Sequence, residues 1–136
     1  MIEDNKKRLK DITNCSFSLL DITKSPHEDS FDAAYSLDVI EHIRPELGGN
    51  FMTNICKSLK PHGVCIIGTP NIEASKYAQL QSAQGHVNLK SSEDLQAILS
   101  QYFHNGFLFS MNDEVVHTGF YPMAHYFLAV GVGVKG

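Results

Sequence analysis

The sequence predicts an α/β fold with a mostly parallel, doubly wound sheet and an antiparallel strand pair at its C-terminal end. The main observation is one stretch with the order strand, loop, helix, turn, strand: FDAAYSLDVIEHIRPELGGNFMTNICKSLKPHGVCIIGTPN, from Phe31 to Asn71. Both of its strands lack polar alternation, as strands buried on both faces do. Such a unit forms a right-handed crossover between parallel strands. We therefore expect one domain, residues 1–136, with helices on both faces of its sheet.

Composition limits the partners that the chain can have. Its 136 residues are 43% hydrophobic and 19% charged, as in an ordinary globular protein. The formal net charge of −4 argues against nucleic acid or an anionic membrane as the main partner. No apolar run reaches the roughly 18 residues that a membrane helix needs, and the amino terminus lacks a signal peptide's apolar region. Three cysteines without C-x-x-C spacing predict free thiols in a reducing cytoplasm.

The N-terminal third reads as helix, strand, loop and strand. Residues 3–12 predict a short amphipathic helix, and Cys15 to Ile22 predicts a strand that ends at Asp21. After a polar loop, Phe31 to Leu37 is the next strand, followed by a polar loop with a helical turn at Val39–Ile43.

The middle of the chain completes the crossover. Helical spacing of apolar residues predicts a helix from Asn50 to Leu59, which Pro61 and Gly63 of the KPHG turn would end. Val64 to Gly68 reads as a buried strand. The polar segment 69–90 is long for a connection, which is typical of a lid or binding segment.

The last third predicts a helix and two strands. The helix begins at Ser91 and Ser92, carries an apolar stripe, and would end at the sequence His104-Asn105-Gly106. Strands at 107–111 and 126–134 have no strong helix between them, so we expect an antiparallel pair at one edge of the sheet.

The loop after the strand at Phe31–Leu37 holds the best candidates for chemistry. Asp38, Glu41 and His42 stand where open parallel sheets bind ligands, at the carboxyl end of a strand. His42 is suited to accept a proton at neutral pH. The plainer alternatives are that Asp38 caps the following turn, that Glu41 is an exposed carboxylate orienting the loop, and that His42 is structural.

The remaining histidines do not predict a metal centre. His117 and His125 lie near Asp113 and Glu114, but their spacing fits no compact zinc pattern. We expect no metal site. Two other histidines are candidates for a functional role: His86, which lies just before the predicted helix start, and His125.

In this order and spacing, the EH pair after the strand and the signature KPxGxxxxxTPN resemble class I S-adenosylmethionine-dependent methyltransferases. The chain is most similar to the small-molecule methyltransferases of the ubiquinone-biosynthesis type, over about Ile2 to Val134. The resemblance implies a Rossmann-like methyltransferase fold, S-adenosylmethionine as the cofactor and a small-molecule acceptor.

The resemblance also implies roles for individual residues on the cofactor side. Asp21 matches the family acid that accepts a hydrogen bond from the adenine amino group, and Ile22 matches the residue beside the ring. Without the family pattern, Asp21 reads as the start of an Asx-turn. Ser36, Leu37 and Asp38 match the segment beside the cofactor's methionine portion.

On the substrate side, the family pattern continues through two loops. Glu41 and His42 match the pair that faces the acceptor, with His42 as the general base. Three residues match the loop that lines the same pocket: Thr69, Pro70 and Asn71. His86 matches a position where the family often has a histidine facing that pocket.

One departure from the family is large. The glycine-rich cofactor loop of the D-x-G-x-G kind is absent, so the chain resembles the carboxyl-terminal part of a methyltransferase, a truncated domain. The alternative function is therefore a non-catalytic remnant that folds or associates with another chain. Its strand at Cys15–Asp21 would pair directly with Phe31–Leu37, or a homo-oligomer would form through the exposed sheet edge. A weaker alternative, an unrelated nucleotide-binding module, would need a glycine loop.

Overall fold

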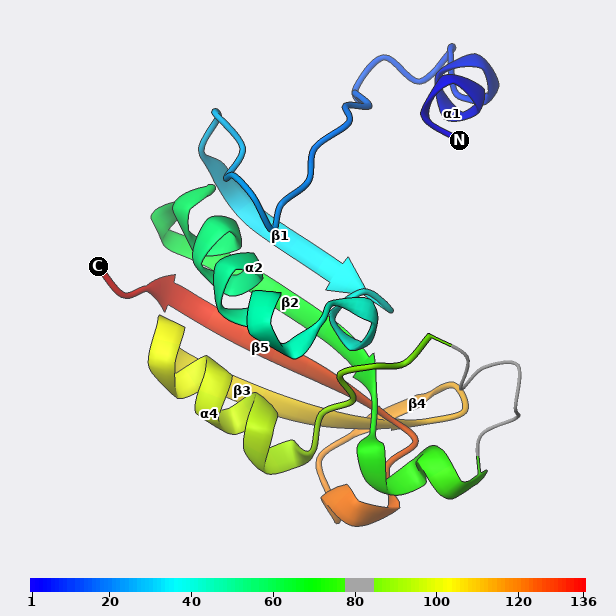
Figure 1. The fold of residues 1–136 in the computed structure, drawn as a ribbon, viewed down its shortest axis with the longest axis vertical. Coiled ribbons are helices and arrows are strands. Elements are labelled where there is room, and N and C mark those ends of the chain that lie inside the picture. Colours follow the sequence, from blue (N-terminus) through cyan, green and yellow to red (C-terminus); the bar gives the residue numbers. More distant parts are fainter. Residues whose placement is uncertain (78–84) are drawn as a thin grey trace.

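A computed structural model describes residues 1–77 and 85–136, with helices and strands arranged around a single sheet (Figure 1). Residues 78–84, part of the expected lid segment, lie outside the described residues. The elements are α1 (Ile2–Arg8), β1 (Phe31–Leu37), η1 (Ile40–His42), α2 (Pro45–Lys57), β2 (Leu59–Pro70), η2 (Ile72–Tyr77), α4 (Ser92–Tyr102), β3 (Phe103–Asn112), β4 (Val115–His117), η3 (Tyr121–Met123) and β5 (Tyr126–Val134).

The five strands are hydrogen-bonded in the order β1-β2-β5-β3-β4. Among the described residues, only β1 and β2 pair in parallel, and the other neighbours are antiparallel. The expectation of a mostly parallel sheet is therefore wrong, although the α/β class and the parallel crossover are confirmed. The reason is the position of β5, which runs against both β2 and β3 and separates two strands that point the same way.

Helices α2 and α4 lie on the same face of the sheet (Figure 1). Their apolar stripes pack on the side chains that this face presents, and together they form the core: Ile40, Phe51, Met52, Ile55, Cys56, Leu59, Cys65, Ile67, Leu95, Leu99, Phe103, Leu108, Ala124, Phe127 and Ala129. Gly131 leaves room for the ring of Phe103, because a Cβ at Gly131 would lie 2.3 Å from the ring's Cδ2. The predicted burial of Cys65 is confirmed.

On the opposite face of the sheet, no helix of the described residues packs against the strands (Figure 1). The register places Tyr35, Ile66, Val130 and Phe107 in one row of apolar side chains across four strands. Tyr35 is 78% exposed and Phe107 53%. The expectation of helices on both faces is thus not met within the described residues.

The predicted strand at Cys15–Ile22 is not formed. These residues are irregular, Leu19 is 89% exposed, and no strand of the described chain pairs with the outer edge of β1. A strand needs a neighbour for its backbone N–H and C=O groups, and an alternating pattern alone does not supply one. The predicted direct pairing with Phe31–Leu37 is wrong.

Three further boundaries differ from the sequence expectation. Helix α2 begins at Pro45 rather than Asn50, since proline suits the first helical position. The KPHG sequence belongs to the early part of β2. Helix α4 ends at Tyr102, and β3 begins at once with Phe103 in extended conformation, so His104-Asn105-Gly106 is not a helix cap.

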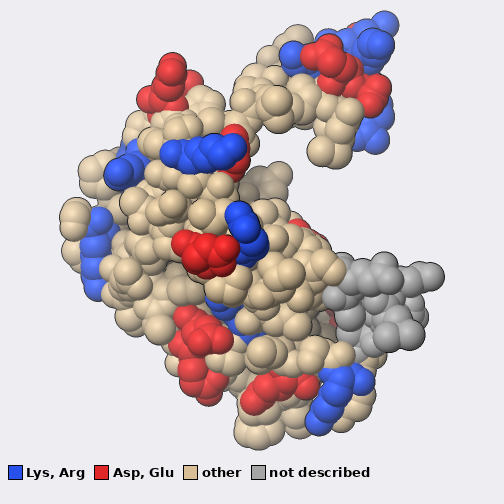
Figure 2. Space-filling view, in the orientation of Figure 1, with Lys and Arg blue, Asp and Glu red and all other residues tan. Residues whose placement is uncertain are grey.

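Helix α1 buries no residue and stands clear of the sheet (Figure 1). Acidic and basic side chains are interspersed on the face seen in Figure 2. None of the helices in the described ranges is both long and apolar enough to cross a bilayer.

Candidate active site

The carboxyl ends of β1 and β2 lie side by side and place the predicted polar residues at one edge of the sheet. Leu37 of β1 is in register with Gly68 of β2, and Asp38 and Thr69 follow directly. The Asp38 N–H donates to the Gly68 carbonyl oxygen at 3.1 Å. Asp38 has a φ of 55°, a left-handed conformation that aspartate tolerates better than most residues. The turn after β1 is thereby fixed, and the chain leads into η1.

Glu41 is buried beneath this edge. Its side chain is 1% exposed, and its Oε2 accepts a hydrogen bond from the Thr69 hydroxyl at 3.0 Å. The plainer interpretation of Glu41 as an exposed loop carboxylate is therefore wrong. Within the described part of the chain, the buried Oε1 atom has no hydrogen-bond donor. An unsatisfied buried polar atom costs about 1–3 kcal/mol, so this oxygen is a candidate ligand-binding atom.

The backbone of Glu41 brings His86 beside His42. The Glu41 carbonyl oxygen accepts hydrogen bonds from the N–H groups of Val87 at 2.8 Å and Asn88 at 3.0 Å. The ring centroids of His42 and His86 are consequently 5.0 Å apart. The sequence expectation that places both histidines at one pocket is thus consistent with the geometry.

The His42 ring also contacts a backbone carbonyl. Its Nδ1 lies 3.0 Å from the oxygen of Gly85, a hydrogen bond that exists when Nδ1 carries the proton. In that tautomer, Nε2 has a free lone pair and is the atom that would accept a proton or bind a cation.

Glu41, His42 and His86 together form a group of potential metal ligands. One donor atom from each lies within 4.8 Å of the other two, and this is the one such group that the described ranges contain. The sequence expectation of no metal site considered only His117 and His125. It missed this group because the two histidines are far apart in the sequence and meet through the backbone contacts of Glu41.

The same edge of the sheet continues into the loop formed by Thr69, Pro70 and Asn71. The three residues make different contacts. Thr69 is fully buried against Glu41, and Pro70 pairs with Tyr126 of β5. Asn71 is buried too, and its amide group contacts only backbone. Its Nδ2 donates to the carbonyl oxygens of Tyr121 at 3.2 Å and Ala124 at 2.9 Å.

The Oδ1 of Asn71 accepts from the N–H of Glu73 at 3.1 Å, so one side chain begins η2 and holds η3 beside it. Asn71 therefore supports the site by holding η2 and η3 together.

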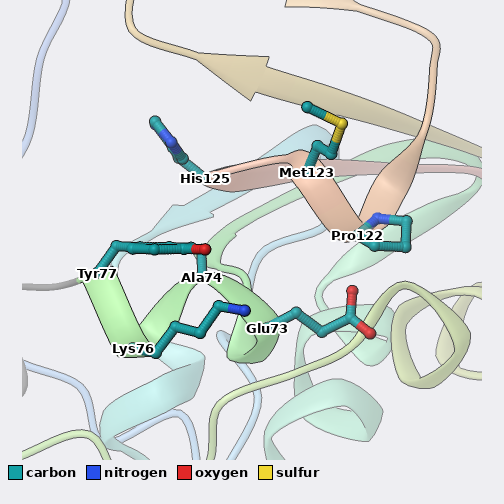
Figure 3. A pocket seen from close by; sticks show the side chains of 7 residues that line it. All are labelled: Glu73, Ala74, Lys76, Tyr77, Pro122, Met123 and His125. Carbon is teal, nitrogen blue, oxygen red and sulfur yellow. The ribbon is translucent and has the colours of Figure 1, made fainter.

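A cleft of about 600 Å³ opens between η2 and η3 (Figure 3). Its lining residues are Glu73, Ala74, Lys76, Tyr77, Pro122, Met123 and His125. His125, a candidate from the sequence analysis, lines this cleft. The other predicted site residues do not. Since Asn71 joins the two walls, the cleft is the direct continuation of the loop after β2.

On the cofactor side, the predicted residues have two different environments. Ser36 and Leu37 end β1, with Leu37 46% exposed. Asp21 instead lies in a turn outside the sheet, where its Oδ1 accepts from the Thr23 N–H at 3.1 Å and hydroxyl at 2.7 Å. Its Oδ2 pairs with the Lys24 ammonium at 3.1 Å. This is the Asx-turn that the local sequence predicted.

Ile22 follows Asp21 and ties this turn to the body of the molecule. Its carbonyl oxygen accepts from Asn54 Nδ2 of α2 at 2.8 Å. The main-chain position of the turn is thus fixed even though Cys15–Ile22 forms no strand.

Tyr126 is a site residue that sequence reasoning did not identify. A Cβ at Gly68 would lie 2.6 Å from the Tyr126 hydroxyl, so this glycine makes room for the phenol at the edge. Burial, and then the nearby Asp38 carboxylate, raise the pKa of Tyr126. The phenol therefore stays protonated at neutral pH beside Asp38. Its position depends on β5, which no local signal near Asp38 could reveal.

The solved structures to which this chain is similar include several methyltransferases. N-methyltransferase NodS from Bradyrhizobium japonicum WM9, in complex with S-adenosyl-l-homocysteine, has a TM-score of 0.68 and 17% identity over 97% of this chain and 61% of that one. The CMeT domain of the citrinin polyketide synthase has a TM-score of 0.71 and 15% identity, over 99% of this chain and 37% of that one. The small RNA methyltransferase HEN1 has a TM-score of 0.57 and 18% identity, over 79% and 14%.

The chain spans less than two thirds of the length of each of these three proteins. At such identities the likeness shows the fold alone. No curated protein matches the sequence. A family model described as a methyltransferase domain matches residues 1–114, which is most of the 136-residue chain. The chain therefore belongs to the methyltransferase domain family.

Proposed function

We propose that the chain carries the acceptor-binding part of an S-adenosylmethionine-dependent methyltransferase, acting on a small molecule. The observation that carries the proposal is the meeting of the two family segments at one sheet edge, where Thr69 of the TPN loop contacts Glu41 of the EH pair. Family membership supports the reaction class, and the complex of NodS with S-adenosyl-l-homocysteine supports the cofactor.

The residues at the end of β1 suit the cofactor's methionine portion. Asp38 is exposed and next to Leu37, and its carboxylate would pair with the amino group of that portion. Contact of Asp21 and Ile22 with the adenine ring stays a prediction. The Asp21 carboxylate is half-exposed but already accepts from Thr23 and Lys24, which leaves it limited capacity for a further donor.

The bound cofactor would supply an electrophilic methyl group, and the chain's own residues would position and deprotonate the acceptor. His42 Nε2 is free to take the proton of an acceptor hydroxyl, because Nδ1 faces the Gly85 carbonyl. Alignment of acceptor and methyl group accounts for most of the acceleration in such transfers. The cleft between η2 and η3, the continuation of the TPN loop, would receive the rest of the acceptor.

A small molecule fits the site better than a nucleic acid. HEN1 is a methyltransferase of small RNA, but the present chain has a net charge of −4 and interspersed surface charges (Figure 2). Binding of a polyanion needs clustered Lys and Arg.

Calorimetric titration of the purified chain with S-adenosyl-l-homocysteine tests the proposal. We expect saturable one-to-one binding, and at least tenfold weaker binding by Asp38→Asn, a change that keeps the left-handed backbone accessible. The matched control is Asp32→Asn, at the opposite end of β1, whose carboxylate pairs with Lys60 at 2.6 Å. It should bind like the unmodified chain.

The second candidate function is a non-catalytic remnant that associates with another chain. It is favoured by the outer edge of β1, with which no strand of the described residues pairs, and by the exposed apolar row that includes Tyr35. If a cooperatively folded chain gave no heat at high micromolar S-adenosyl-l-homocysteine, this chain would not be a methyltransferase that works on its own, and the second candidate would remain. A sedimentation coefficient that rises with protein concentration would then support association.

A further inference from the structure

We propose that the outer edge of β3 binds an extended segment of a partner protein, which adds one antiparallel strand to the sheet. Strand β4 pairs with β3 only at Ser110, Met111 and Asn112. From Phe103 to Phe109, no strand of the described residues pairs with that side of β3. An exposed strand edge presents unpaired backbone N–H and C=O groups, which serve as a template for a further strand.

The hairpin between β3 and β4 shows which backbone groups of β3 face outward. Asn112 and Val115 flank its two-residue turn, and the pair that closes such a turn exchanges backbone hydrogen bonds. The direction of these groups alternates along a strand. The N–H and C=O groups of His104, Gly106 and Leu108 therefore point in the same direction as those of Asn112, away from β5.

A contact of Leu108 agrees with this direction. Its carbonyl oxygen accepts from the hydroxyl of Tyr121, a residue of η3, at 3.4 Å. Among the described residues, the backbone groups of His104 and Gly106 on this edge have no hydrogen-bond partner. Gly106 also has no side chain that could cover them. This part of β3 is therefore open to an added strand.

A groove of about 590 Å³ follows the same edge. Its lining includes four consecutive residues of β3, Gly106 to Phe109, whose side chains alternate between the two faces of the sheet. The groove therefore lies along the edge and not on one face. Gln96, Leu99 and Ser100 of α4 form one wall, and Thr118, directly after β4, lines it as well. An added strand would gain side-chain contacts with this wall besides its backbone hydrogen bonds.

The charge at one end of the groove indicates the chemistry of the segment. Lys135 lines the groove near the beginning of β3, together with His104. The Lys135 ammonium donates to the Ser100 carbonyl oxygen at 2.5 Å and has further N–H donors. Within the described part of the chain, no Asp or Glu lines the groove. Because an antiparallel strand ends where β3 begins, an acidic side chain near the C-terminal end of the segment would pair with Lys135.

The register gives a second position of the segment. A Cβ at Gly106 would lie 2.8 Å from the Leu99 Cβ, so this side of β3 faces α4. Residues opposite each other on paired strands share a face, and a residue opposite Gly106 would contact the apolar wall at Leu99. The residue two positions later lies opposite His104, beside Lys135. The groove thus fits an extended segment with the order apolar residue, any residue, acidic residue.

The probe is the peptide TVTLTE, with fluorescein at its amino terminus and an amidated carboxyl terminus, titrated with the full chain and followed by fluorescence anisotropy. Its valine, leucine and glutamate would face α4, with the leucine opposite Gly106. We expect saturable binding. The reversed peptide ETLTVT has the same composition and should bind at least fivefold more weakly, because its glutamate would lie away from Lys135.

Backbone methylation of the peptide tests strand addition directly. An N-methyl group on the leucine removes the N–H that would donate to Gly106 and should weaken binding at least tenfold. The matched control is an N-methyl group on the threonine that follows, whose N–H points away from β3, and it should leave binding unchanged. Equal effects of the two methyl groups would overturn the proposal, and so would the lack of saturable binding at millimolar peptide.

Two further measurements locate the bound peptide. Lys135→Gln should weaken binding of TVTLTE about fivefold, as loss of an exposed ion pair does, and leave binding of TVTLTQ unchanged. Lys57→Gln, at an exposed position of α2, is the matched control and should bind both peptides like the unmodified chain. In hydrogen exchange followed by NMR, the peptide should slow exchange at the N–H groups of His104 and Gly106. Slower exchange at the outer edge of β1 instead would overturn the assignment to β3.

Discussion

At the scale of single residues, Asn71 is an example of a site residue whose role is structural. The family pattern placed Asn71 in the acceptor pocket, yet its amide donates to two backbone carbonyls and accepts from the Glu73 N–H. These groups come from η2 and η3, the two walls of the cleft. Asn71 thus acts by holding the walls together.

Replacement of Asn71 by alanine should destabilise the fold by about 2–3 kcal/mol, because it leaves the carbonyls of Tyr121 and Ala124 without their donor. Urea unfolding followed by circular dichroism measures the loss. Asn50→Ala, at an exposed position of α2, is the control and should change the free energy of unfolding by less than about 0.5 kcal/mol. Equal effects of the two changes would contradict the structural role.

Residue-level prediction from the sequence succeeds where the controlling contacts are local. Asp21 forms the Asx-turn that its neighbours Thr23 and Lys24 suggest. Glu41 was misjudged, because its burial depends on Thr69 and on the segment around Val87, both distant in sequence. The proximity of His42 and His86 was available only through the family resemblance.

At the scale of elements, α4 is the helix whose start is best encoded. Ser91 accepts from the Asp94 N–H at 3.1 Å, and the Asp94 carboxylate accepts from the Ser91 N–H at 2.9 Å, a complete capping box. The sequence predicted this start because both partners lie within four residues.

Ser91→Ala should lower the free energy of unfolding by about 1 kcal/mol, since it leaves an N–H at the helix start without its acceptor. Ser100→Ala, at an exposed position of the same helix, tests for a mere change in helix propensity and should be neutral or slightly stabilising. Thermal or urea unfolding of both variants distinguishes loss of the cap from a change in helix propensity. If Ser91→Ala were as stable as the unmodified chain, the cap would have no role in stability.

Other elements were predicted less well, for a shared physical reason. The range of β5 was predicted correctly, whereas Cys15–Ile22 has a strand-like pattern and no partner. The end of α4 was misplaced because the chain enters β3 directly, where pairing of Phe103 with Val134 outweighs the local turn signal of His104-Asn105-Gly106. Strands depend on neighbours that a local pattern does not specify.

At the scale of the whole molecule, two buried thiols predict how stability depends on pH. Burial raises the pKa of Cys56 to about 11 and that of Cys65 to about 12. In the unfolded chain, a thiol loses its proton above about pH 8.5. Between these values the unfolded state binds fewer protons, so stability falls as pH rises.

We expect the free energy of unfolding to drop from about pH 8.5 to pH 11, by up to about 1.4 kcal/mol per pH unit for each thiol. Urea unfolding measured at several pH values gives this dependence, and its slope against pH should become flatter in the double variant Cys56→Ala/Cys65→Ala. Cys15→Ala removes an exposed thiol and should keep the slope of the unmodified chain. A slope that persists in the double variant would assign the effect to other groups.

The order of the sheet was the least predictable property of the molecule. The parallel β1–α2–β2 crossover followed from the buried-strand pattern, and the antiparallel pairing of β3 with β5 followed from the missing helix between them. The sequence placed that pair at an edge, whereas β5 lies beside β2. Which strand edge a late strand joins is decided by long-range packing.

The position of β5 has a consequence for biosynthesis. Of the five described strands, β5 is the last in the sequence but lies third in the sheet, with β2 on one side and β3 on the other. While the ribosome is still making this region, β2 and β3 have no strand between them, and the sheet remains in two parts. Tyr126 and Phe127 belong to β5 itself, so the central sheet and the edge that carries the candidate site are completed together, only once β5 has been made.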